Sequence, residues 1–266
     1  MPHDSAGPAV SGTAGFGAVE RRLLAVMPLH AVTDRYGEGG LRERLLIEAG
    51  RLPAADRERV LVALEWMGRL HAGDRRQREA YACHPLRVAI RILSHYRVDD
   101  ADVACAALLH DTVEDHAGEL APGGSREAAV AVVAGEFGGR VASLVEAVTS
   151  PQWAPGADRH KQYRAHVKAS LDRCPWARVV KVSDFTDNAV GLFHTTGESL
   201  PRRAAKYRPL VPVLREMVLR ADTPLDGDVK EMIARQLDKA DGRLAALTGE
   251  DGGAEVRDGE GRRVRG

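Results

Sequence analysis

An abrupt change from apolar to polar residues marks the strongest candidate for chemistry in the sequence. The segment ADVACAALLHDTVEDH is small and apolar in its first half and then presents His110, Asp111, Glu114 and Asp115. On a helix, residues four apart share a face about 6 Å apart along the axis, so His110 would lie over Glu114. Asp111 would likewise lie over Asp115. Four such groups without a metal would bring like charges together, so we predict that His110 and Asp111 bind a metal ion. The alternative is a solvated helix end.

A second histidine precedes a proline in the segment YACHPL. Pro85 fits the first turn of a helix and leaves His84 at the N-terminal boundary, from where its ring can point into a cleft. A capping or core histidine is the alternative, and the metal interpretation depends on the other ligands.

A further set of polar residues interrupts the hydrophobic segment VVKVSDFTDNAVGL, namely Asp184, Asp187 and Asn188. Ionised residues on such a helix need a partner. Asp184 and Asn188 are four apart and share a face, and Asp187 is three residues from Asp184 and also nearby. Spacing alone therefore leaves open which carboxylate binds metal.

Two histidines and two aspartates without a thiolate suit Mn²⁺, Fe²⁺ or a similar six-coordinate ion, and we expect Mn²⁺. A metal held in this way lowers the pKa of its bound water and polarises a phosphoryl oxygen, which predicts a phosphohydrolase without a nucleophilic side chain. Glu114 and Asp115 are the natural neighbouring carboxylates. One would have a raised pKa and handle protons while the other orients the attacking water, and the sequence does not assign the two roles.

A basic loop lies upstream of His84, in the segment HAGDRRQREAYACHP. It carries Arg75, Arg76 and Arg78 after a helix stop at Gly73. The planar fork of arginine matches phosphate oxygens in pairs, so the loop could bind the non-reacting phosphates or stack on a base. A solvated charged loop is the alternative.

Apolar residues recur at helical spacing along most of the chain, and no stretch gives convincing strand alternation. One helix is predicted after Pro53, where Val60, Leu61, Leu64, Met67 and Leu70 form an apolar stripe that Gly73 ends. Further helices are predicted at about 18–29, 41–50, 84–97, 101–115, 126–137, 139–148, 157–173, 176–192, 202–221 and 225–246. Turns between helices are expected at Gly39-Gly40, Pro122-Gly123-Gly124, Gly138-Gly139 and Pro155-Gly156. The predicted fold class is all-α, an irregular helical bundle.

Length and composition predict one domain with loose ends. The 266 residues are 44% hydrophobic, enough to bury one sizeable core. Residues 1–17 are rich in Gly, Ala, Ser and Pro, and residues 249–266 alternate glycine with charge, so both ends are expected to be disordered tails. The domain is expected to cover residues 18–248.

Charge and cysteine usage restrict the partners and the compartment. Lys+Arg and Asp+Glu each number 38, so neither nucleic acid nor a membrane surface is expected as the main partner. No stretch approaches the ~20 apolar residues of a membrane span. The three cysteines, Cys83, Cys105 and Cys174, are odd in number and widely spaced, which suits reduced core thiols and a cytoplasmic protein. The sequence gives no prediction of oligomeric state.

Taken together, these motifs resemble the HD superfamily, and within it the hydrolase domain of RelA/SpoT-type alarmone enzymes and their small stand-alone relatives. The resemblance spans about residues 68–215. It rests on HAGDRR at 71–76, YACHPL at 81–86, LLHDTVED at 108–115, EFGGRV at 136–141 and VKVSDFTDN at 180–188. It implies an HD-type helical bundle.

The resemblance also implies a ligand set and a reaction. The Mn²⁺ ligands would be His84, His110, Asp111 and Asp184. Glu114 and Asp115 match the catalytic acidic pair. Arg75 and Arg76 match positions that contact the guanosine nucleotide, Tyr81 lies in the same segment, and Asn188 matches an asparagine near the nucleotide sugar. The implied reaction on this small-molecule nucleotide is removal of the 3′-pyrophosphate from (p)ppGpp.

The chain departs from the family pattern at some positions. The family pattern around the last aspartate is DRLHN or a close variant, whereas this chain has DFTDN at 184–188. The second basic position of the upstream loop is commonly a lysine in the family and is Arg76 in this chain. The loop from 116 to 126 is also longer than usual, and a hydrolase without a synthetase region is expected. Two alternatives are an HD phosphatase or phosphodiesterase for another nucleotide or metabolite, and a non-catalytic nucleotide-binding HD module. The complete ligand set argues against the module.

Overall fold

The computed structural model describes residues 15–76, 79–121, 123–150, 158–190 and 200–248. The predicted all-α class is confirmed, since 79% of these residues are helical and very few lie in strands. The helices are α1 (Ala18–Val26), α2 (Leu29–Ala49), α3 (Ala54–Leu70), α4 (Cys83–Ser94), α5 (Ala101–Leu109), α6 (Thr112–Asp115), α7 (Ala117–Leu120), α8 (Arg126–Phe137), α9 (Gly139–Val148), α10 (Arg159–Arg173), α11 (Pro175–Phe185), α12 (Leu200–Tyr207), α13 (Val211–Leu219) and α14 (Gly227–Thr248). The predicted tails fall mainly outside the described residues, at 1–14 and 249–266.

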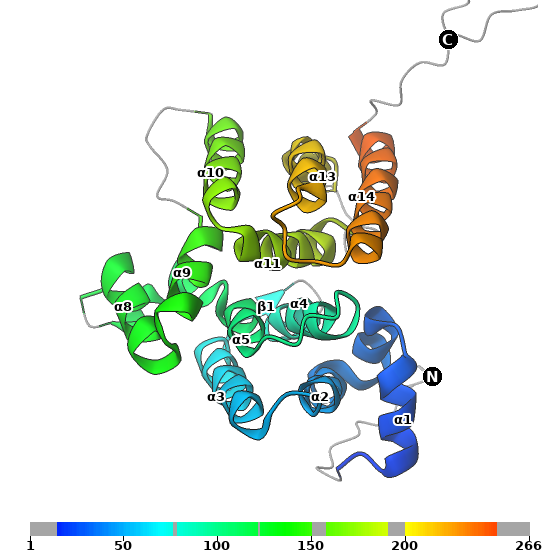
Figure 1. Cartoon of the computed structure of the whole chain (residues 1–266), viewed down its shortest axis with the longest axis vertical. Helices are drawn as coiled ribbons and strands as arrows, with labels where there is room; N and C mark the ends of the chain where they lie inside the picture. Colours follow the sequence, from blue (N-terminus) through cyan, green and yellow to red (C-terminus); the bar gives the residue numbers. More distant parts are fainter. Residues whose placement is uncertain (1–14, 77–78, 122, 151–157, 191–199, 249–266) are drawn as a thin grey trace, which may run out of the picture.

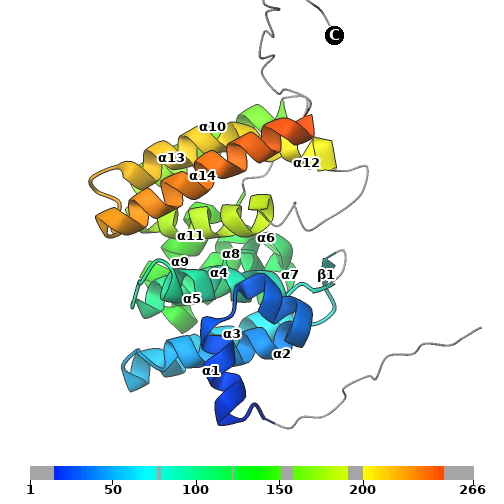
Figure 2. The ribbon, with the colours of Figure 1, turned by 90° about the vertical axis from the view of Figure 1, so that its right-hand side faces the viewer.

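The helices form stacked layers (Figures 1 and 2). α1, α2 and α3 form one outer layer, and α4 and α5 pack on it, α4 against α2 and α5 against α3. α11 lies on the other side of α4, and α10, α13 and α14 cover the far side of α11. α4, α5 and α11 are therefore the central elements of the fold.

One continuous apolar cluster runs through these layers, from Leu24 in α1 to Leu244 in α14. α5 lies at its centre, and nearly all of its side chains are buried. Asp100 begins this helix, because its carboxylate accepts hydrogen bonds from the backbone N–H groups of Asp102 and Val103. The C-terminal end of α5 is thereby fixed in the interior, next to α4 and α11.

The predicted turn at Gly39-Gly40 is wrong, because both glycines lie inside α2. The helix bends two residues earlier, at Gly37, which has a positive φ of 59°. A Cβ at position 40 would clash with the Cβ of Tyr36, so Gly40 permits close packing there. The first helix, α1, ends at Val26, and Pro28 directly precedes α2.

Three other predicted helices are interrupted in the structure. The predicted helix 101–115 consists of α5 and the short α6, with His110 and Asp111 in the turn between them. The predicted helix 176–192 continues beyond Phe185 as a π-helical turn, Thr186–Val190. The predicted helix 202–221 is divided into α12 and α13 by a 3₁₀ turn at Arg208–Leu210. Local changes in helical pitch of this kind leave little trace in the apolar periodicity.

A short hairpin was not predicted. β1 (Arg75–Arg76) and β2 (Glu79–Ala80) pair in antiparallel fashion, with Arg75 opposite Ala80. The basic loop of the sequence is therefore an ordered hairpin on either side of residues 77–78, which lie outside the described part of the chain. Within the described residues, no helix has the length and apolar character needed to span a bilayer.

Candidate metal centre

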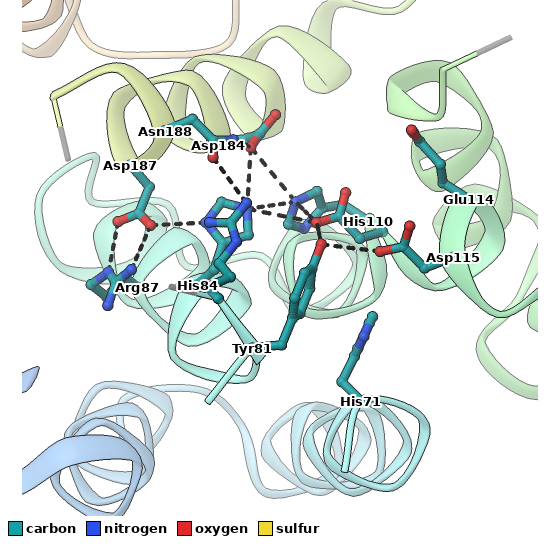
Figure 3. Close-up of polar contacts among 12 residues, drawn as sticks. His71, Tyr81, His84, Arg87, His110, Glu114, Asp115, Asp184, Asp187 and Asn188 are labelled. Carbon is teal, nitrogen blue, oxygen red and sulfur yellow. Dashed lines mark hydrogen bonds and ion pairs between the residues drawn. The ribbon is translucent and has the colours of Figure 1, made fainter. Parts of the chain in front are cut away.

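Four side chains from three central elements converge in the interior (Figure 3). His84 is in the first turn of α4, His110 and Asp111 form the turn after α5, and Asp184 is near the end of α11. Both histidines are buried, with 0% and 2% exposure, and Asp184 is 6% exposed. All four predicted metal ligands are thus brought together.

The donor atoms of these side chains face one another. His84 Nε2 lies 3.2 Å from His110 Nε2 and 3.3 Å from Asp184 Oδ1. Asp111 Oδ2 is 3.1 Å from His110 Nε2 and 3.7 Å from His84 Nε2. Two ligands at right angles around a cation at about 2.1 Å stand about 3 Å apart, so these separations suit adjacent positions on one ion.

The outer nitrogen of each imidazole has its own partner. Nδ1 of His84 is 2.8 Å from Asp187 Oδ2, and Nδ1 of His110 donates to the carbonyl oxygen of Ala107 at 2.8 Å. Each Nε2 therefore offers its lone pair to the centre. Two facing lone pairs need a cation between them, either a proton on one ring or a metal ion. The donor set of two nitrogens and two carboxylate oxygens fits a divalent metal.

The charges around the centre favour a cation. Burial lowers the pKa of His110, but the neighbouring charges of Asp111 and Asp184 outweigh burial and raise it to about 9. Burial raises the pKa of Asp111, but His110 and His84 outweigh it and hold that pKa far below its ordinary value. The side chains alone therefore hold a proton at neutral pH where a metal would bind.

Asp184 and Asp187, which spacing could not distinguish, lie on different sides of the His84 ring (Figure 3). Asp184 faces the inner nitrogen Nε2, whereas Asp187 contacts the outer nitrogen Nδ1. The second oxygen of Asp184 accepts a hydrogen bond from Lys181 Nζ at 2.8 Å. Asp184 is therefore directed into the centre, and Asp187 orients the histidine from behind.

Asp187 is itself held in a buried ionic network. Arg87 Nε donates to Asp187 Oδ1 at 2.8 Å, and Arg91 approaches the same oxygen at 3.1 Å. Arg87 also donates to both carboxylate oxygens of Glu79. Burial raises the pKa of Asp187, but Arg87 and His84 outweigh burial and hold it well below its ordinary value. The sequence indicates Asp187 but not this network, because the arginine partners of Asp187 lie about a hundred residues away in the chain.

The two predicted catalytic carboxylates have different surroundings (Figure 3). Tyr81 donates its hydroxyl hydrogen bond to Asp111 Oδ2 at 2.6 Å, and the same hydroxyl lies 3.1 Å from Asp115 Oδ2. Burial and then the charge of Asp111 raise the pKa of Asp115 above its ordinary value. Glu114 accepts a hydrogen bond from the backbone N–H of Ser150 at 2.9 Å. Asp115 is therefore electrostatically connected to the centre, and Glu114 is turned toward the end of α9.

Three of the four predicted substrate-side residues border a cleft of about 1070 Å³, which none of the four predicted metal ligands lines. Arg75, Arg76 and Asn188 line it, together with residues of α2, α4 and α14. Arg76 donates to Asn188 Oδ1 at 2.9 Å and lies 5.1 Å from the centre of the Tyr81 ring. Asn188 in turn donates to Asp184 Oδ1. Arg76 and Asn188 therefore connect the metal centre to the cleft. Tyr81 contacts Asp111 and does not line the cleft.

Known proteins are similar to this chain in sequence. A family model described as HD domain matches residues 63–173. A human protein named guanosine-3′,5′-bis(diphosphate) 3′-pyrophosphohydrolase MESH1 is 34% identical over 143 residues, which covers 52% of this chain and 72% of the human protein. The chain belongs to the HD-domain family of this human protein. The resemblance inferred from the motifs is confirmed.

Other relatives of this HD-domain protein have similar names. The zebrafish (Danio rerio) MESH1 protein is 35% identical, and the match covers 44% of this chain but only 58% of the zebrafish protein. A guanosine-3′,5′-bis(diphosphate) 3′-pyrophosphohydrolase of Aquifex aeolicus is 30% identical over 60% of this chain and 21% of its own length.

One solved structure supports the fold of this HD-domain protein. It belongs to a protein described as "a metazoan ortholog of SpoT" that "hydrolyzes ppGpp and plays a role in starvation responses". The two structures superpose with a TM-score of 0.55 at 24% sequence identity, over 73% of this chain and 98% of the other. The likeness establishes the HD-type helical fold.

Proposed function

We propose that this protein is a metal-dependent nucleotide pyrophosphohydrolase that removes the 3′-pyrophosphate from (p)ppGpp-like alarmones. One observation carries the proposal: two buried imidazoles direct their Nε2 atoms at each other, 3.2 Å apart, with a carboxylate oxygen of Asp111 and of Asp184 beside them. The 34% identity to a human protein named as such a hydrolase supports the choice of substrate. His84, His110, Asp111 and Asp184 are the proposed ligands, and Mn²⁺ is the proposed ion.

The ion would polarise a phosphoryl oxygen and acidify bound water, which is the chemistry that a divalent metal supplies in a hydrolase. The protein side chains hold and orient the reacting groups. Asp187 fixes the His84 ring through Nδ1, and the Ala107 carbonyl fixes His110. Water would add to the phosphorus bonded to the 3′ oxygen and lose a proton, the bond between that phosphorus and the 3′ oxygen would break, and the 3′ oxygen would take up a proton. The products would be pyrophosphate and the nucleoside 5′-diphosphate or 5′-triphosphate.

We assign proton handling to Asp115. Its pKa lies above the ordinary carboxyl value because burial and the charge of Asp111 disfavour its ionised form. The Tyr81 hydroxyl, within reach of both Asp111 and Asp115, holds the two carboxyl groups in a fixed relation. Glu114, anchored by the backbone of Ser150, would orient the attacking water from the α9 side.

The nucleotide would occupy the cleft beside the centre. Arg75 and Arg76 present guanidinium groups that match phosphate oxygens, and Asn188 offers an amide next to Asp184. Tyr81 can contact a substrate only from the edge of this region, because its hydroxyl already faces the two carboxylates. The basic hairpin and the π-helical turn thus form the substrate side of the centre.

A substrate panel with Mn²⁺-loaded protein tests the proposal. We expect ppGpp to yield GDP and pyrophosphate, and pppGpp to yield GTP and pyrophosphate, as separated by ion-exchange chromatography. Turnover of ppApp or simple nucleotides in preference to these would favour a different HD phosphohydrolase. No turnover of any compound, with binding of nucleotide intact, would identify a non-catalytic module and contradict the proposal.

Metal affinity is expected to increase with pH. His110 has a pKa raised to about 9, so the side chain is protonated at pH 7.5 and must lose that proton before Nε2 binds a cation. We expect Mn²⁺ binding at pH 7.5 to release about one proton, and the affinity to rise roughly tenfold per pH unit up to about pH 9. Calorimetric titration in buffers with different ionisation enthalpies measures the released proton. Equal affinities at pH 6.5 and 8.5 would contradict this.

We also propose a reducing, cytoplasmic location for the protein. Cys83, Cys105 and Cys174 are all free, and the first two are buried. Burial raises the pKa of the Cys83 and Cys105 thiols to about 12, so they stay protonated and unreactive at neutral pH. Thiols of this kind serve as core residues.

A further inference from the structure

A second cluster of potential metal ligands lies outside the centre described above. His71 ends α3, Asp74 lies in the loop before β1, and His116 follows α6. The ring of His71 stacks on Tyr81, with centroids 4.4 Å apart and planes inclined by 14°, so the tyrosine ring separates the two clusters. The tyrosine hydroxyl donates to Asp111. The tyrosine ring faces His71 (Figure 3).

Three atoms of this second cluster form a small triangle. Asp74 Oδ2 is 2.8 Å from His71 Nδ1 and 2.8 Å from His116 Nε2, and the two nitrogens are 3.0 Å apart. Ligands at right angles around a cation at about 2.1 Å would have the same separations. The triangle therefore has the dimensions of one face of a coordination sphere.

The surroundings of the two rings direct these atoms inward. Nδ1 of His116 is 2.7 Å from Glu119 Oε1, which leaves Nε2 as the nitrogen that points to Asp74. A carboxylate behind a ligating histidine is a common feature of metal sites. Nε2 of His71 is buried without a hydrogen-bond partner among the described residues, so the polar contacts of this ring are made through Nδ1.

Protonation and access also suit a cation. Both imidazoles hydrogen-bond to Asp74 and lower the pKa of its carboxyl group, while burial lowers the pKa of His71. Burial also lowers the pKa of His116, but its hydrogen bonds to Glu119 and Asp74 outweigh burial and raise it, so this ring must give up a proton to an incoming ion. An ionised aspartate and a neutral histidine are the forms that bind metal. The Asp74 side chain is 37% exposed and Glu119 is 64% exposed, so solvent can reach the cluster and complete the coordination of an ion.

We propose that His71, Asp74 and His116 form a second divalent-metal site. Two imidazoles and one carboxylate suit Zn²⁺ or a similar transition-metal ion. An ion at this position would tie the end of α3 and the loop before the Arg75–Arg76 strand to the turn after α6. It would thereby position the basic hairpin and the Tyr81 ring relative to Asp115.

Zinc stoichiometry tests this site separately from the proposed catalytic centre. Protein stripped with EDTA would be equilibrated with Zn²⁺ alone by dialysis, and the bound metal measured by elemental analysis. We expect two Zn²⁺ per chain in the unmodified protein, and one in Asp111→Ala, which loses the first centre. His116→Ala should also bind one, and the double variant none.

Two further variants keep the second site testable if His116→Ala does not fold. Asp74→Asn removes the ligand charge from a partly exposed side chain and should also lose one Zn²⁺, with an unchanged circular-dichroism spectrum. Glu119→Gln should weaken the second site by about 10–100-fold, because it removes the carboxylate behind His116. Two Zn²⁺ in both His116→Ala and Asp74→Asn, or none in Asp111→Ala, would overturn the second site. Unchanged zinc content in Asp111→Ala alone would instead contradict the first centre.

Discussion

Replacing Asp111 by alanine is expected to remove the metal and lower kcat/KM for ppGpp by on the order of 10³-fold or more. The substitution deletes an oxygen that lies 3.1 Å from His110 Nε2 and 3.7 Å from His84 Nε2. The variant retains the two facing imidazoles, and Asp184 is then the one proposed carboxylate ligand left to balance the charge of a divalent ion. Manganese content after gel filtration and steady-state kinetics at saturating Mn²⁺ measure the two effects.

Variants of the acidic pair serve as controls for Asp111→Ala. Asp115→Asn and Glu114→Gln should both retain Mn²⁺, because neither carboxylate contacts a ligating nitrogen. Asp115→Asn is expected to lower kcat by about 10²–10⁴-fold, the usual contribution of a general acid or base. Glu114→Gln should lower turnover as well. If Asp111→Ala kept its metal and its activity matched that of these variants, the ligand assignment would be wrong.

Asp187→Ala is expected to have the largest effect on stability. The substitution removes the buried carboxylate that Arg87 and Arg91 share. Among the described residues, Arg87 then keeps only its partners on the half-buried side, and Arg91 keeps only the Ser183 hydrogen bonds. Removing one partner of a buried ion pair costs about 3–5 kcal/mol. For a chain of this size that corresponds to a fall in Tm of about 6–20 °C, measurable by calorimetry. Asp228→Ala is the matched control. Asp228 accepts two hydrogen bonds from Arg97, but its side chain is 70% exposed, so its Tm should hardly change.

The isosteric variant Asp187→Asn separates charge from shape. The pKa of Asp187 is held well below its ordinary value, so its charge stabilises the fold above the carboxyl pKa of the unfolded chain, near 4. That stability is lost as the pH falls further. The unfolding free energy of the unmodified protein should therefore exceed that of Asp187→Asn by the largest amount at pH 7. This difference should decrease below about pH 4. A difference that stays constant with pH would show that shape, not charge, is responsible.

Much of the centre could be predicted from the sequence, because its chemistry coincides with a change in local pattern. The polar run after the apolar α5 indicated His110 and Asp111, and Pro85 indicated the position of His84 at a helix start. The choice between Asp184 and Asp187 could not be made from spacing. These residues lie at the junction of α11 with a π-helical turn, and the turn directs them to opposite nitrogens of one ring.

The features that escaped prediction depend on contacts between distant segments. His71 and His116 are far apart in the chain, and nothing in the surrounding residues of either indicates that they meet at Asp74. The glycines of α2, in contrast, predicted a turn that is not present at their position. Gly40 is a residue type typical of turns, but here it allows a close approach to Tyr36 within α2, next to the kink at Gly37.

The origin of the four ligands in α4, the α5–α6 turn and α11 has a consequence for folding. These elements are separated by long stretches of chain and meet only where the central layers have packed. No local segment contains more than the adjacent pair His110-Asp111, so a partly folded chain would bind metal weakly. Ions that bind only the native state add to its free energy of unfolding, by about 2.7 kcal/mol at a hundredfold excess over Kd. Metal supply would therefore set the fraction of chains that are folded, in addition to the rate of the proposed reaction.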